Sequence, residues 1–140
     1  MPGFSDSRTR MFLRVLTAIG LGVDAYVHAD LAGQFDGNTG SGGLSQGNLF
    51  RIEAAVASLA ALLILVHGRR LAAAFALVVA ASALAAVLVT RYYDIGAIGP
   101  LPDMYDPAWY TEKTVSAIAE AFAVVTSASL LLNLHRRVKR

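Results

Sequence analysis

The stretch LAAAFALVVAASALAAVLVT, residues 71–90, holds no ionisable side chain and consists largely of alanine, leucine and valine. A helix rises about 1.5 Å per residue, so about 20 residues cross the roughly 30 Å hydrocarbon layer of a bilayer. We therefore expect a transmembrane helix over residues 71–91. Three further apolar stretches are also long enough to span a membrane, and they cover residues 11–31, 49–66 and 109–134.

The composition also indicates a membrane protein. The 140 residues are 56% hydrophobic and 16% charged, whereas soluble domains carry about 25% charged residues. The mean hydropathy is +0.54. The absence of cysteine excludes disulfides, thiolate metal sites and thiol chemistry. We expect one transmembrane domain over residues 1–140, whose helices pack against each other and against lipid.

The charged residues are sorted along the chain in a way that predicts topology. Nine of the twelve Lys and Arg residues fall in three clusters, which are Arg8, Arg10 and Arg14; Arg69 and Arg70; and Arg136, Arg137, Lys139 and Arg140. Nine of the ten acidic residues lie between them, within residues 24–53 and 94–120. Basic residues that flank membrane spans stay cytoplasmic. The predicted fold is an all-α, antiparallel up-down four-helix transmembrane bundle with both termini cytoplasmic.

The basic clusters do not imply a nucleic-acid partner, because anionic lipid head groups already attract arginines next to a membrane. Ten arginines against two lysines, together with abundant alanine, favour a bacterial source and hence the plasma (inner) membrane. An alternative interpretation of the first span is a secretory signal cleaved after Ala29, since a basic start precedes a short apolar run. Asp24 interrupts that run, so we favour a retained span.

The two outer loops differ in composition. Residues 33–47 contain the sequence GNTGSGG, which is typical of a mobile linker. Residues 94–108 contain three prolines and many apolar side chains, so we expect an ordered segment folded over the helix ends or lying in the interface. Asp106 followed by Pro107 predicts the N-cap and first residue of the fourth helix.

Ionisable residues inside the spans mark the predicted site. Asp24 and His28 are four residues apart and share a helix face. Small residues beside the acidic positions of the second and fourth spans permit close helix packing. The sequence predicts a pocket open to the outer side that gathers Asp24, His28, Glu53, Glu120 and Lys113, with Arg51 and Arg91 at its rim. We expect Asp24 or Glu120 to be neutral or paired with Lys113 or an arginine.

Several roles for this cluster stay open. Acidic residues within a membrane are expensive and are functional candidates by default, but they can also fix helix register through hydrogen bonds. Asp24, His28, Glu53 and Glu120 together suit a hard or borderline divalent metal. A protonatable carboxylate could drive export. A bis-histidine haem site is disfavoured, because His67 and His135 are expected at the opposite membrane surface.

The sequence favours a non-enzymatic protein, since it has no nucleophile–base arrangement, no phosphate-binding glycine loop and no histidine-rich box. We predict an accessory or small-ligand-binding membrane subunit, in contact with lipid and part of a larger complex or a homo-oligomer. A divalent metal, a lipid and a quinone are the ligand classes considered. The alternative is a proton- or metal-coupled small-molecule carrier that acts as a homo-oligomer.

Overall fold

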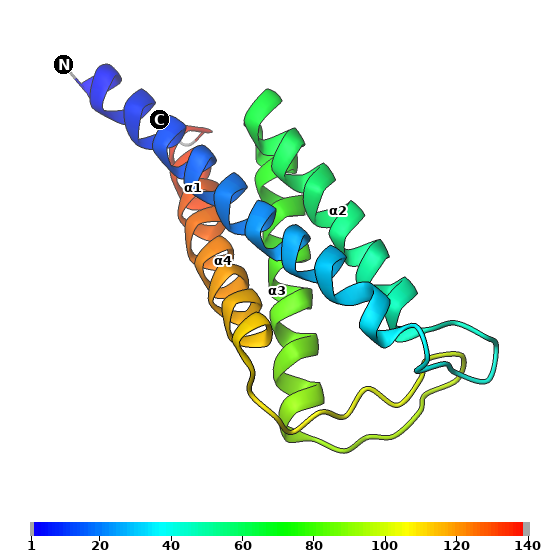
Figure 1. The fold of residues 1–140 in the computed structure, drawn as a ribbon. Helices are drawn as coiled ribbons and strands as arrows, with labels where there is room; N and C mark the ends of the chain where they lie inside the picture. The colour runs from blue at the N-terminus through cyan, green and yellow to red at the C-terminus, as the bar shows by residue number, and fades with distance from the viewer. Residues whose placement is uncertain (1, 139–140) are drawn as a thin grey trace.

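The computed structural model describes residues 2–138, and within that range it is helical without strands (Figure 1). Met1 and the basic residues Lys139 and Arg140 lie outside it. The helices are α1 (Pro2–Leu31), the short 3-10 helix η1 (Ala32–Phe35), α2 (Gln46–Val66), α3 (Arg70–Tyr92) and α4 (Thr111–Val138). Four of them are long and apolar enough to cross a membrane, which confirms the prediction of four apolar helices.

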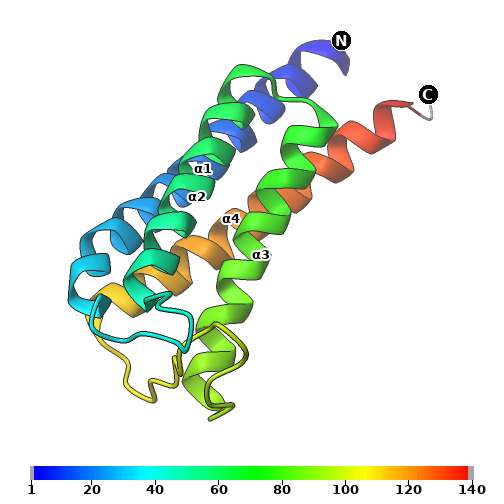
Figure 2. The same ribbon diagram turned by 90° about the vertical axis from the view of Figure 1, so that its right-hand side faces the viewer.

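The four long helices run alternately up and down. Both termini and the α2–α3 turn lie at one end, which we call the turn end, and the two long connections lie at the other, the loop end (Figures 1 and 2). α1 packs against α2 and α4, and α3 packs against the same two helices. The helices therefore enclose a common interior. The side of the membrane that each end faces stays a prediction from the basic clusters.

The connection between α3 and α4 departs from the sequence prediction at Asp106. This residue does not open α4, which begins at Thr111. Its carboxylate oxygen Oδ1 instead accepts a hydrogen bond from the backbone N–H of Ala108 at 3.2 Å, and its own N–H donates to the carbonyl of Thr90 at 2.9 Å. The predicted N-cap is wrong, because Asp106 closes a local turn that ties the connection to the end of α3.

The turn end is closed by a basic side chain. Gly68 has a φ of 53° in the short turn between α2 and α3, a left-handed conformation that glycine adopts without strain. Arg14 of α1 reaches this turn, where its Nε donates to the carbonyl of Ile64 at 2.9 Å and its guanidinium also donates to the carbonyl of Leu65. The last carbonyls of a helix have no partner within the helix. Arg14 supplies one and joins α1 to the end of α2.

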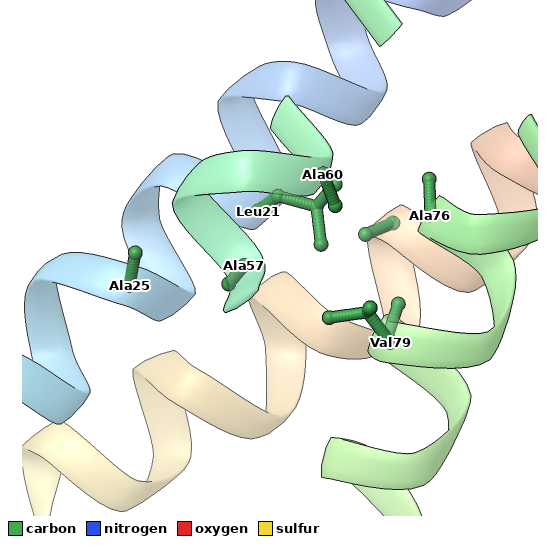
Figure 3. Packing of buried hydrophobic residues seen from close by; sticks show 8 residues of the cluster. Leu21, Ala25, Ala57, Ala60, Ala76 and Val79 are labelled. Atoms are coloured by element: carbon green, nitrogen blue, oxygen red, sulfur yellow. The ribbon is translucent and has the colours of Figure 1, made fainter. Parts of the chain in front are cut away.

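Small side chains build the core. Figure 3 shows Leu21 of α1 beside Ala60 of α2, facing Ala76 and Val79 of α3. α1 and α4 pack closely at Gly20, where an added Cβ would sit 3.0 Å from the Ala119 carbonyl oxygen. Without a hydrophobic driving force between helices in lipid, such close backbone packing is what holds a membrane bundle together.

The glycine-rich loop folds against the proline-rich connection. The side-chain amide of Asn38 donates to the Asp103 carbonyl at 2.7 Å and to Gln46 Oε1 at 2.7 Å. Gly40 lies so close to Pro100 that a Cβ would overlap the Pro100 carbonyl. These contacts tie residues 33–47 to the proline-rich connection, and the mobility expected from their glycine content stays a prediction. The two loops together form a cover over the loop end.

Candidate functional site

A cavity of about 360 Å³ lies under this cover, and all four long helices contribute to it. Its walls are mainly apolar and include Val27, Leu31, Phe50, Ile52, Val87 and Met104. Its polar side chains include Gln46, His28, Glu53, Ser116, Lys113 and Asp106. The connection between α3 and α4 forms part of the wall through Leu101, Met104 and Tyr110. The cavity is thus an apolar chamber with polar groups at selected points.

Next to the polar floor of the cavity, α1 and α4 bring a histidine and two carboxyl groups together. The His28 Nδ1 lies 2.9 Å from Asp24 Oδ1. The Ser116 hydroxyl donates to Glu120 Oε1 at 2.6 Å and lies 3.2 Å from Asp24 Oδ1. Asp24 and Glu120 are fully buried, and His28 is 9% exposed. We call Asp24, His28, Ser116 and Glu120, with the neighbouring Glu53, the acidic cluster.

The acidic cluster leaves several oxygen atoms without a hydrogen-bond partner. Asp24 Oδ2, Glu120 Oε2 and Glu53 Oε1 are all buried and unpaired. Glu53, on α2, is close enough to interact with the carboxylate of Asp24 and with His28. A buried oxygen without a partner costs about 1–3 kcal/mol, and more when it is charged. This destabilising feature lies in the acidic cluster, which borders the cavity.

The neighbouring cations are engaged elsewhere. Lys113 Nζ donates to the Asp106 backbone carbonyl at 2.6 Å and lies 3.4 Å from Asp106 Oδ2. The predicted pairing of Asp24 or Glu120 with Lys113 or an arginine is therefore absent from the described residues. The reason lies in the connection after α3, which folds back and brings the carbonyl and carboxylate of Asp106 to Lys113.

Arg51 and Arg91 also have other partners. Arg51 holds both carboxylate oxygens of Asp36, at 2.6 and 2.9 Å, and this hydrogen bonding lowers the pKa of Asp36. The Arg91 guanidinium stacks over Tyr92 at 4.8 Å and Trp109 at 5.6 Å. Neither arginine lines the cavity. Their predicted place at a pocket rim is replaced by roles at the surface of the loop end.

The charges of the acidic cluster are therefore not balanced by lysine or arginine among the described residues. Three carboxyl groups face one imidazole in a region shielded from water. Moving an unpaired charge into such a region costs several kcal/mol. Protons or a bound cation must compensate the negative charge, so the cluster is suited to binding cations or exchanging protons.

The structure places Asp24, His28, Glu53 and Glu120 close together, as expected from the sequence. Their role in binding a ligand or a metal stays a prediction. The walls were not found from the sequence: Phe50 packs edge-on against the His28 ring with centroids 5.1 Å apart, and Tyr110 closes the cavity near Lys113. The apolar, proline-containing connection was the one signal for this wall.

Comparison with known proteins adds no relative: no family model, no curated protein and no solved structure matches this chain. The function of this chain is therefore inferred from the site itself.

Proposed function

We propose that this chain is a small-ligand-binding subunit of a membrane, and that its ligand is an amphipathic molecule with an apolar body and a polar or cationic end. The observation that carries the proposal is the cavity of about 360 Å³ with apolar walls and a polar floor of His28, Glu53 and Ser116. Ligand sites commonly have volumes of about 300–1,000 Å³, apolar walls and few polar groups. The negative floor favours a cationic or hydrogen-bond-donating end.

Access from the side fits a ligand that is dissolved in lipid. α2 and α3 diverge from their turn toward the loop end (Figure 2), and the cavity is lined from both helices there. Two of the lining residues, Ile52 and Ala86, are exposed on the outside of the bundle. A lipid or a quinone could enter between these helices without crossing water, which agrees with the ligand classes expected from the sequence.

The proposal also covers the membrane in which the subunit lies and the side that its termini face. Its support is the placement of Arg14, Arg69 and Arg70 at the turn end and of the acidic loops at the loop end, which favours cytoplasmic termini; the plasma membrane is proposed from the arginine- and alanine-rich composition. The lipid-facing sides of the helices leave room for a larger complex or a homo-oligomer. In either assembly the cavity remains the part of the molecule with room for a ligand.

Native mass spectrometry of the protein, extracted from its own membrane in mild detergent, tests the proposal. We expect an organic mass retained on the wild-type chain and lost from Ala86→Trp, because the indole fills the cavity mouth. Ala85→Trp is the matched control, since Ala85 is an exposed alanine on the same helix that does not line the cavity. Wild-type protein without retained mass, or equal retention in both variants, contradicts the proposal.

The buried, unpaired oxygens of Asp24 and Glu120 favour a second function, a proton- or metal-coupled carrier. A carrier moves its substrate across a sealed membrane, whereas a binding subunit does not. In liposomes that enclose a pH-sensitive dye, a carrier gives substrate-dependent proton flux that Glu120→Gln abolishes. A binding subunit gives retained ligand and no flux.

A further inference from the structure

We infer that Asp24, His28 and Glu120, with Glu53 beside them, bind a divalent metal ion of the Mn²⁺, Fe²⁺ or Zn²⁺ kind at the floor of the cavity. The inference deepens the proposed function and rests on it in one respect, because the cavity is the route by which the ion enters. The ion offers a fixed contact to an oxygen or nitrogen lone pair at the closed end of an apolar chamber, so the ligand of the metal-loaded site has a neutral or anionic polar end and not a cationic one.

The geometry of the donors supports the inference. Asp24, His28 and Glu120 each offer one ligand atom, and these atoms lie within 4.8 Å of one another. Metal–ligand bonds of this kind measure about 2.0–2.2 Å, so small side-chain movements bring the atoms to one ion. Two donors come from successive turns of α1 and the third from α4, whose close packing at Gly20 holds the two helices together.

An independent observation is the set of unpaired oxygens. Asp24 and Glu120 are fully buried, yet Asp24 Oδ2 and Glu120 Oε2 have no hydrogen-bond partner. Buried hydroxyls of the same interior are satisfied: the Thr17 hydroxyl donates to the Leu13 carbonyl and lies 2.9 Å from the Thr126 hydroxyl. The bundle therefore pairs its buried hydroxyls and leaves the carboxyl oxygens of the cluster free for a ligand.

The charge balance of the acidic cluster also favours a bound metal ion. Lys113 is held by Asp106 and Arg51 by Asp36, so neither neutralises the cluster. A divalent ion compensates two carboxylates and at the same time bonds to the unpaired oxygens. A proton on one carboxyl removes one charge and lets its O–H donate to a neighbouring carboxylate oxygen, so the metal titration below is what separates the two forms of compensation.

The donor set indicates the class of ion. One imidazole nitrogen with two or three carboxylate oxygens suits Mn²⁺, Fe²⁺ and Zn²⁺. Ca²⁺ and Mg²⁺ prefer oxygen ligands alone, and soft Cu⁺ prefers sulfur, which this cysteine-free chain supplies only as methionine.

Ser116 is a positioning residue for this site. Its hydroxyl donates to Glu120 Oε1 at 2.6 Å and lies 3.2 Å from Asp24 Oδ1. Groups that hold metal ligands in place in this way typically change metal affinity by about 10–100-fold when they are removed. Ser116→Ala should therefore weaken binding without abolishing it.

The experiment measures the metal directly. The full chain is purified without chelator and analysed by inductively coupled plasma mass spectrometry, then stripped with EDTA and titrated with MnCl₂ while free Mn²⁺ is followed by electron paramagnetic resonance. We expect about one ion per chain. Glu120→Gln should lose it, Ser116→Ala should bind about 10–100-fold more weakly, and Glu112→Gln should behave as wild type, because Glu112 is an exposed acid on the same helix.

Asp24→Asn is the second variant, and circular dichroism confirms that each variant has the wild-type helix content. Absence of Mn²⁺, Fe²⁺ and Zn²⁺ binding to wild type, or wild-type binding by both Glu120→Gln and Asp24→Asn, overturns the inference. The experiments distinguish failure of the metal site from failure of the proposed function. A retained organic mass without bound metal contradicts the metal site but not the ligand-binding subunit. Bound metal without a retained organic mass contradicts the ligand-binding subunit but not the metal site.

Discussion

The two ends of this bundle are built from the same small residues but differ in what they bury. At the turn end, Ile64 and Leu130 are fully buried together with Ala73, and Arg14 closes the last turn of α2. At the loop end, the interior holds Asp24 and Glu120 with unpaired oxygens, next to a cavity. The turn end is closely packed, whereas the loop end keeps a cavity and a group of buried carboxyl groups.

The difference sets the acidic cluster apart, because its buried carboxyl oxygens lack the partners that nearby buried hydroxyls have. Polar residues near the middle of the bundle satisfy one another, as Thr17 and Thr126 do at 2.9 Å. Functional sites commonly break local rules that the rest of a protein obeys. If the loop end is such a site, substitutions in the two halves should have opposite effects on stability.

The largest expected effect lies in the packed half. Leu130→Ala removes a fully buried side chain, and the cavity left behind should lower the free energy of unfolding by about 2–5 kcal/mol. Leu132→Ala is the control on the same helix, since Leu132 is 61% exposed and should change stability little. Reversible unfolding in SDS-containing mixed micelles measures both. Equal losses in the two variants would contradict the proposed division between interior and lipid-facing positions.

A smaller effect of opposite sign is expected in the acidic cluster. Glu120→Gln keeps the shape of a fully buried side chain and removes an ionisable group that lacks a full set of partners. The free energy of unfolding of the metal-free protein should rise by about 1 kcal/mol. The same unfolding assay with EDTA tests this, with Glu112→Gln as control. A fall instead of a rise would show that Glu120 fixes helix register, and the two halves would then be alike.

The smallest effect is expected on the exposed surface of the loop end. Hydrogen bonds from Arg51 lower the pKa of Asp36. Their contribution to the free energy of unfolding is therefore present at pH values above the ordinary aspartate pKa, and it is lost as the pH falls through the lowered pKa. Carbon-13 NMR of the Asp36 carboxyl group should show this lowered pKa in wild type. Arg51→Met should return it toward the ordinary value without loss of ligand, because Arg51 does not line the cavity. An unchanged titration in Arg51→Met would contradict the ion pair.

Particular residues show where sequence reasoning succeeds. The i, i+4 spacing of Asp24 and His28 places them on one face of any helix, and the structure has them 2.9 Å apart. The four apolar spans follow from hydropathy alone. The predicted helix start at Asp106 is wrong, because a local Asp–Pro signal competes with the tertiary hydrogen bond from Asp106 to Thr90.

The ion-pair partners of the lysine and arginine side chains could not be predicted from the sequence. Lys113 could have reached toward Glu120 or toward the loop, and the choice depends on the path of the connection that carries Asp106 back over α4. Arg51 meets Asp36 only because the glycine-rich loop returns along the start of α2. In both cases flexible side chains select the nearest carboxylate in space, and loop geometry decides which one that is.

The sequence by itself determined the number of apolar helices, their order, and the sorting of basic and acidic residues to opposite ends, because hydropathy and charge are properties of short segments. Only the tertiary structure decided that carboxyl groups from α1, α2 and α4 meet beside a cavity and that the nearby cations turn away. Those contacts depend on how the helices rotate and cross, which is set by close approaches such as the one at Gly20.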